Sequence, residues 1–153
     1  GKLAAGNASW IWQTGKYYFE NVNALVSVAG VSDVKVVPFI ERMDYAYAAA
    51  DVIISRAGAG TISELCLAGK PVVLVPSPNV AEDHQTKNAL ALSSAGGAVL
   101  VKDNELEKAL LPEIFSLIAD ENRRRSLSEN IRKMAVRGSD MKIAQEILKL
   151  TGR

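Results

Sequence analysis

Residues 51–76, DVIISRAGAGTISELCLAGKPVVLVP, decide the fold of this chain. Two apolar runs, at 52–54 and 72–75, show no polar alternation, which is typical of strands buried on both faces of a parallel sheet. Between them, residues 61–68 are long enough for about two helical turns. The stretch therefore predicts a strand–helix–strand unit with a right-handed crossover.

The turn at residues 57–60, Ala-Gly-Ala-Gly, is the first candidate site. Small residues let the backbone approach a ligand closely, and a helix beginning at Thr61 starts with amide N–H groups that lack partners. Those donors and the helix dipole favour an anion at the carboxyl edge of the sheet. Glu64 would repel a phosphate there, so we expect it to accept both hydroxyl hydrogens of a ribose instead.

A purely structural interpretation of the same residues stays open. Thr61-x-x-Glu64 also has the spacing of a capping box, in which both side chains only satisfy backbone N–H groups. The turn is not a Walker A loop, because it lacks Gly-Lys-Ser/Thr. It is not a dinucleotide-binding fingerprint either, because Ser63 stands where the third glycine would be.

Size and composition exclude several classes of protein. The chain has 153 residues, of which 48% are hydrophobic and 23% charged, as expected of one soluble globular domain. The net charge of +1 gives no reason to expect nucleic acid as a partner. The lone Cys66 is expected in the core, and the chain is expected to come from a reducing compartment. With only one His and one Cys, a transition-metal site is not expected. We expect neither a signal peptide nor a membrane span.

Hydrophobic periodicity on either side of the central unit predicts a doubly wound α/β fold, that is, a Rossmann-like parallel sheet. A helix end is expected at 1–6 and a loop at 77–82. The further strands expected are 9–13, 34–37 and 98–101. The further helices expected are 17–28, 43–50, 83–94, 105–119 with Pro112 only at a kink or restart, 122–137 and 140–150.

A short basic run, Arg123-Arg124-Arg125, lies in one of these helices. Glu121 and Glu129 dilute its charge, so we expect a solvated helix face. Binding to a membrane or a lipid phosphate is the weaker alternative.

Three segments together, Phe39-Ile40, residues 56–64 and residues 85–89, resemble one family in their order and spacing. They are similar to the C-terminal, donor-binding domain of the MurG family of GT-B glycosyltransferases, from about Ile11 to the end of the chain. The resemblance implies one UDP-sugar donor-binding domain over 1–153. It also implies a full-length inverting hexosyltransferase that moves N-acetylglucosamine from UDP-N-acetylglucosamine to the lipid-linked muramyl-pentapeptide (lipid I to lipid II) in peptidoglycan synthesis, at the cytoplasmic face of the bacterial inner membrane.

The resemblance also implies which residues contact the donor nucleotide. The backbone at Ile40 and the side chain of Met43 would meet the uracil, while Phe39 is expected in the core. Gly60 and Thr61 match contacts to the α-phosphate. Glu64 matches the glutamate that binds the ribose.

Further donor contacts are expected at Arg56, His84 and Gln85. Arg56 either counters the diphosphate charge or pairs with a carboxylate to hold the loop, and we favour the second role. His84 and Gln85 stand where the family usually has two glutamines that contact the sugar hydroxyls. Because His84 replaces the first of these glutamines, the identity of the sugar stays open. Asn88, one helical turn after His84, either orients His84 and Gln85 or caps the loop.

The family's domain opens with a further strand and a Gly-Gly-Ser-type loop that residues 1–153 lack. In the strand order 3-2-1-4-5-6 the absent strand is central, so we expect two unpaired inner strand edges. Exchange of segments between chains or edge pairing would compensate. The resemblance places the general base and the contacts to the lipid-linked acceptor on an absent N-terminal domain, so no catalytic residue, metal or cofactor is expected here, and the chain alone is expected to be inactive.

Two alternatives stay open. The chain could be the donor-binding subunit of a two-chain enzyme that adds N-acetylglucosamine to a dolichol-linked sugar. It could also belong to another GT-B protein that uses UDP-sugars, such as a glycolipid synthase or a UDP-N-acetylglucosamine epimerase.

Overall fold

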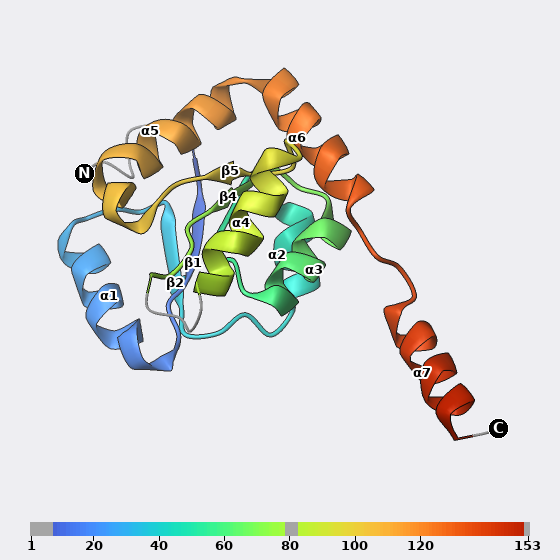
Figure 1. The fold of residues 1–153 in the computed structure, drawn as a ribbon. Coiled ribbons are helices and arrows are strands. Elements are labelled where there is room, and N and C mark those ends of the chain that lie inside the picture. Colours follow the sequence, from blue (N-terminus) through green and yellow to red (C-terminus); the bar gives the residue numbers. More distant parts are fainter. Residues whose placement is uncertain (1–7, 79–82, 152–153) are drawn as a thin grey trace.

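The computed structural model describes residues 8–78 and 83–151, and its strands are all parallel. They form two separate sheets (Figure 1). The strands are β1 (Trp10–Gln13) paired with β2 (Val34–Val37), and β4 (Val72–Leu74) paired on one side with β3 (Ile53–Ser55) and on the other with β5 (Val99–Leu100). The helices are α1 (Lys16–Val28), α2 (Met43–Ala49), α3 (Ala59–Ala68), α4 (His84–Ser94), the 3-10 turn η2 (Asp103–Glu105), α5 (Leu106–Ala119), α6 (Glu121–Lys133) and α7 (Ser139–Leu150).

Strand β4 is the middle strand of the three-stranded sheet. Its apolar run is fully buried, with Val72 and Leu74 in a cluster with residues of α3 and α4, and Val73 in a second cluster with residues of α5. Helices therefore cover both faces of the three-stranded sheet, because successive side chains of a strand point to opposite faces. The predicted Rossmann-like, doubly wound architecture is confirmed in this part of the chain.

Helix α6 contributes to both core clusters, because Ile131 belongs to the first cluster and Leu127 to the second. Asp120 caps its first turn by accepting a hydrogen bond from the Arg123 amide at 2.9 Å. Arg123 also pairs with Glu113 of α5 at 2.5 Å, and Arg124 donates to the carbonyl of Leu117 at 2.7 Å. Of the three arginines, only Arg125 is therefore on the expected solvated face, because Arg123 and Arg124 bind α6 to α5.

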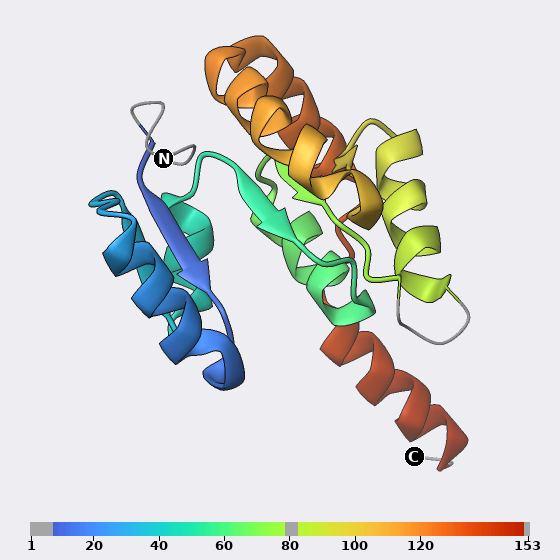
Figure 2. The same cartoon turned by 90° about the vertical axis from the view of Figure 1, so that its left-hand side faces the viewer.

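The two-stranded sheet lies apart from the three-stranded one (Figure 2). Strand β1 pairs only with β2, and β3 only with β4, so each has one edge without a partner strand among the described residues. Ile11 and Trp12 of β1 are 58% and 45% exposed. Trp10 packs partly against the second core cluster. The two unpaired strand edges expected from the sequence are thus those of β1 and β3.

Several boundaries differ from the sequence predictions. Helix α3 begins at Ala59 rather than Thr61, because Ala and Gly, which suggested a turn, form its first two positions. Pro112 lies inside the uninterrupted α5, and α6 ends at Lys133 rather than 137. The predicted helix end at 1–6 and part of the predicted loop at 77–82 lie outside the described residues.

Two exposed features lie outside the layered core. Phe39 is 65% exposed, so its expected place in the core is wrong. Phe39 lies two residues after the end of β2 and belongs to neither of the two core clusters. Helix α7 extends away from the rest of the molecule (Figures 1 and 2).

Candidate functional site

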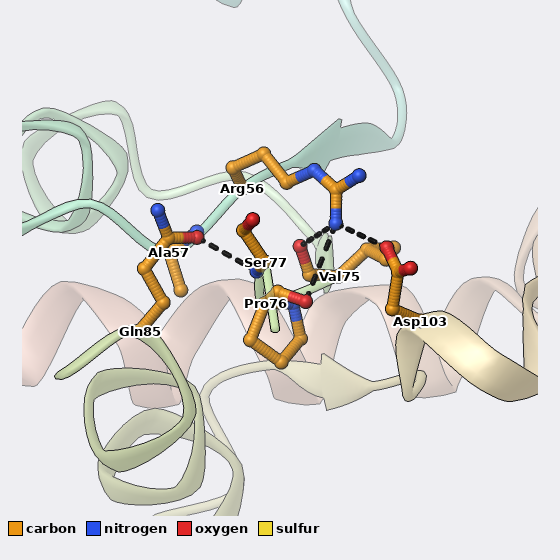
Figure 3. A network of polar contacts seen from close by, with 7 residues as sticks. All are labelled: Arg56, Ala57, Val75, Pro76, Ser77, Gln85 and Asp103. Carbon is orange, nitrogen blue, oxygen red and sulfur yellow. Dashed lines mark hydrogen bonds and ion pairs between the residues drawn. The ribbon is translucent and has the colours of Figure 1, made fainter. Parts of the chain in front are cut away.

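The loops that follow β3, β4 and β5 meet at the carboxyl edge of the sheet, and Arg56 joins them (Figure 3). Its Nη1 donates to the carbonyls of Val75 and Pro76 at 3.2 and 3.3 Å and pairs with Asp103 at 2.5 Å. Of the two roles expected for Arg56, pairing with a carboxylate is thus observed. A contact to a diphosphate stays a prediction.

Gln85 and Asn88, from α4, hold the start of the glycine-rich turn. Ala57 is fully buried, and its N–H donates to Gln85 Oε1 at 3.3 Å. The same oxygen accepts from the amide of Ser77 at 2.9 Å, while Asn88 Nδ2 donates to the carbonyl of Ala57 at 3.0 Å. Gln85 therefore ties the loop after β3 to the loop after β4 (Figure 3). This structural role was missed from the sequence, because its partners are backbone groups.

The N-terminus of α3 is open. Its N-cap is Gly58, which has no side chain to cap the helix, and the first amide to find an acceptor is that of Ile62, bonded to the Gly58 carbonyl at 2.9 Å. In the described part of the chain, the N–H groups of residues 59–61 have no acceptor. A helix that begins with unsatisfied N–H groups and a positive dipole end is a site for an anion.

The capping-box interpretation of Thr61 and Glu64 is wrong. Thr61 is the third residue of α3, not its N-cap, and no side chain caps this helix. The Glu64 carboxylate instead accepts a hydrogen bond from the hydroxyl of Tyr47, in α2, at 3.1 Å. The Glu64 side chain is therefore available at the exposed surface of α3.

The glycines of the turn are not required by the packing of the chain itself. A Cβ at Gly60 would meet nothing within 4 Å, and one at Gly58 would meet only Thr61 Oγ1 at 3.7 Å. Gly69 differs because its φ is +61°, and Gly97 differs because a Cβ there would lie 3.1 Å from the backbone of Ile131. Among the described residues, the space beside Gly58 and Gly60 is thus open, as close approach of a ligand requires.

The residues expected at the uracil lie at the carboxyl edge of the first sheet. The N–H of Ile40 donates to Gln13 Oε1 at 2.8 Å, so the side chain of Gln13 now occupies that donor. Met43 is the first residue of α2 and is half-buried. Helix α2 packs beside α3, so Met43 and Glu64 belong to neighbouring helices.

His84 and Gln85 are the first two residues of α4. The preceding Asp83 has a φ of +55°, a left-handed conformation that Asp tolerates better than most residues. The start of α4, which carries both candidates for the sugar site, therefore lies at the same edge as the glycine-rich turn, where the Ala57 N–H donates to Gln85 Oε1.

The pKa values of Tyr47 and Cys66 are both raised. Partial burial, the hydrogen bond to Glu64 and the charge of Glu64 raise the pKa of Tyr47 to about 12. Burial raises the pKa of the Cys66 thiol, which lies in the core as expected. The phenol of Tyr47 therefore stays protonated near neutral pH and remains a hydrogen-bond donor.

A depression of about 250 Å³ lies elsewhere, at the amino ends of β3 and β4. It is far from the glycine-rich turn along both strands, so it is not part of the candidate site. Its lining residues are Ala50, Asp51, Lys70, Pro71, Glu121, Arg124, Arg125, Ser128 and Arg132. In the described residues, no group of three or more His, Cys, Asp or Glu side chains could hold a metal ion. No described helix is long and apolar enough to cross a bilayer.

Comparison with known proteins gives a consistent result. Residues 2–147 match the model of the glycosyltransferase family 28 C-terminal domain. The UDP-N-acetylglucosamine–N-acetylmuramyl-(pentapeptide) pyrophosphoryl-undecaprenol N-acetylglucosamine transferases of Bacteroides thetaiotaomicron and Parabacteroides distasonis are 56% and 52% identical over 92% and 97% of this chain. These matches cover 38% and 40% of the two relatives, so the chain spans about two fifths of their length.

Solved structures agree with the sequence relatives. The crystal structure of Acinetobacter baumannii MurG is similar with a TM-score of 0.82 and 30% identity, covering 97% of this chain and 44% of that chain. The glycosyltransferase of kitacinnamycin, at 20% identity and a TM-score of 0.56, shares the fold.

Proposed function

This chain belongs to the glycosyltransferase family 28 C-terminal domain family, and from that premise we propose that residues 1–153 form the donor-binding domain of an N-acetylglucosaminyltransferase. The donor is UDP-N-acetylglucosamine and the acceptor is the lipid-linked muramyl-pentapeptide of peptidoglycan synthesis. Relatives named for this reaction are 52–56% identical to the chain, which supports this assignment over other UDP-sugar enzymes.

The open N-terminus of α3 carries the proposal. The amides of residues 59–61, which have no acceptor among the described residues, are the donors for the α-phosphate. Gly60 leaves room for that phosphate to approach the backbone. Glu64, one turn further on, accepts the ribose hydroxyls. A diphosphate and a diol are thus bound by groups of one helix.

The remaining contacts come from neighbouring loops. The backbone of Ile40 and the side chain of Met43 hold the uracil, after Gln13 has released the Ile40 amide. His84 and Gln85 face the sugar, and Gln85 uses its NH₂ group because its oxygen is held by Ala57 and Ser77. Arg56 supports the loops through Asp103 and adds positive charge near the diphosphate.

The chemistry follows from this placement. The acceptor hydroxyl attacks the anomeric carbon from the face opposite UDP, the glycosidic bond to the diphosphate breaks, and the configuration inverts. Negative charge develops on the leaving diphosphate, where the α3 amides and the helix dipole stabilise it. The general base and the acceptor contacts come from a further domain.

The same proposal places the protein at the cytoplasmic face of the bacterial inner membrane, as a peripheral enzyme, because its acceptor is lipid-linked. The unpaired edges of β1 and β3 then pair with a further strand, either from the same protein or by exchange with a second copy.

Calorimetry on the full-length protein tests the proposal. We expect UDP-N-acetylglucosamine to bind more tightly than UDP-glucose, and preference for UDP-glucose would contradict the assignment. Glu64→Ala should weaken UDP binding by about 1–3 kcal/mol, because hydrogen bonds to a charged group are lost. Unchanged UDP affinity in this variant would show that Glu64 does not bind the ribose.

A further inference from the structure

Glu64 is held by a side chain from the neighbouring helix. The Tyr47 hydroxyl donates to Glu64 Oε2 at 3.1 Å, joining residues 17 positions apart in α2 and α3. We infer that Tyr47 is a positioning residue, which fixes the Glu64 carboxylate in the orientation that receives the ribose diol of the donor. This inference rests on the proposed function of Glu64.

The two side chains differ in their freedom. The Tyr47 ring is partly buried against the first core cluster, so the fold itself fixes where the hydroxyl lies. Glu64 is exposed and has a flexible side chain, and ordering such a side chain on binding costs conformational entropy. The hydrogen bond to the fixed tyrosine restricts the carboxylate to one orientation before the donor binds. Such preorganisation reduces the entropy cost of binding.

The bond leaves the carboxylate able to bind a diol. A carboxylate has two oxygens with about four lone-pair sites, and Tyr47 uses one site on Oε2. Oε1 and the remaining sites can accept both ribose hydroxyls. The Tyr47 phenol, whose pKa is raised to about 12 mainly by partial burial, is a hydrogen-bond donor near neutral pH, as an ordinary tyrosine is.

This role has a kinetic signature. The ribose does not change during transfer, so its contacts are equally strong in the ground state and the transition state. An interaction of that kind affects KM and leaves kcat unchanged. A residue that only stabilised the packing of α2 on α3 would change thermal stability without this separation of KM from kcat.

Tyr47→Phe in the full-length enzyme tests the inference, because it removes the hydroxyl and keeps the ring. We expect KM for UDP-N-acetylglucosamine to rise about fivefold, the scale of one modest hydrogen-bond effect, with kcat unchanged. Tyr45→Phe is the matched control. Tyr45 lies in the same helix and is 63% exposed, with the Arg42 guanidinium 3.9 Å above its ring, so KM should not change.

A double-mutant cycle with Glu64→Ala decides whether Tyr47 acts through Glu64. We expect Tyr47→Phe to cause no further rise in KM when Glu64 is already alanine. An unchanged KM in Tyr47→Phe, or an equal rise in both backgrounds, would overturn the inference. Failure of the proposed function is a separate outcome: calorimetry would then show that the wild-type enzyme binds no UDP-sugar, or that Glu64→Ala binds it as tightly as wild type.

Discussion

The three-stranded region, residues 51–133, and the two-stranded region, residues 10–37, bury very different shares of their apolar side chains. Every buried core residue except Val34 lies in the first of these. Helix α1 has no buried residue, and its Leu25 is 70% exposed. Arg56 and Gln85, the two proposed donor-site residues with the most internal hydrogen bonds, belong to the three-stranded region. We conclude that this region holds its own site in place, whereas the two-stranded region depends on further packing.

Truncation of a core residue gives the largest expected difference between the regions. Leu74→Ala should lower the free energy of unfolding by about 2–5 kcal/mol, because Leu74 is fully buried and a cavity remains. Leu25→Ala should lower it by less than about 0.5 kcal/mol, since this leucine is mainly in solvent. Urea unfolding of the 153-residue chain measures both. Equal losses would mean that α1 is as well packed in solution as the three-stranded region.

The two glutamines that join loops provide a second, smaller test. Gln85→Ala leaves the amides of buried Ala57 and of Ser77 without their acceptor, so we expect a loss of about 1–3 kcal/mol in unfolding free energy. Gln13→Ala frees only the amide of Ile40, in an exposed setting where water can replace the glutamine. Its loss should be less than about 0.5 kcal/mol. A larger loss for Gln13→Ala would show that the two-stranded region is the better ordered one.

A third comparison lies within the three-stranded region and has the smallest effect on stability. Gly60→Ala should be neutral or raise the unfolding free energy by up to about 1 kcal/mol, because alanine favours a helix and the new Cβ meets nothing. The same Cβ should weaken UDP binding by about tenfold, or ~1.4 kcal/mol. Gly97→Ala is the control, since its Cβ would press on the Ile131 backbone and lower stability. Unchanged UDP affinity in Gly60→Ala would exclude phosphate contact at this backbone.

The sequence predicted the three-stranded region well because its signals are local. The apolar run at β4 indicated a strand buried on both faces, and Cys66 was correctly expected in the core. The two unpaired strand edges, but not the division into two sheets, were expected from the resemblance to a family with one more strand. Phe39 was placed wrongly because an apolar residue after a strand gives no sign of whether another layer covers it.

Contacts between distant residues were the part that could not be predicted. The bond from Tyr47 to Glu64 joins two helices, and neither residue type nor spacing signals it. The backbone bonds of Gln85 depend on where the loop after β4 passes. Helix α3 began earlier than expected because Ala59 and Gly60 suit a turn as well as a first helical turn.

A crystal structure of the full-length protein with UDP would show directly whether the N-terminus of α3 binds the donor. We predict that the diphosphate lies against the amides of residues 59–61 and that both ribose hydroxyls lie within hydrogen-bond distance of the Glu64 carboxylate. If UDP is absent from the N-terminus of α3, and lies at the depression beside Lys70 and Arg132 or is not bound at all, this helix is not the donor site.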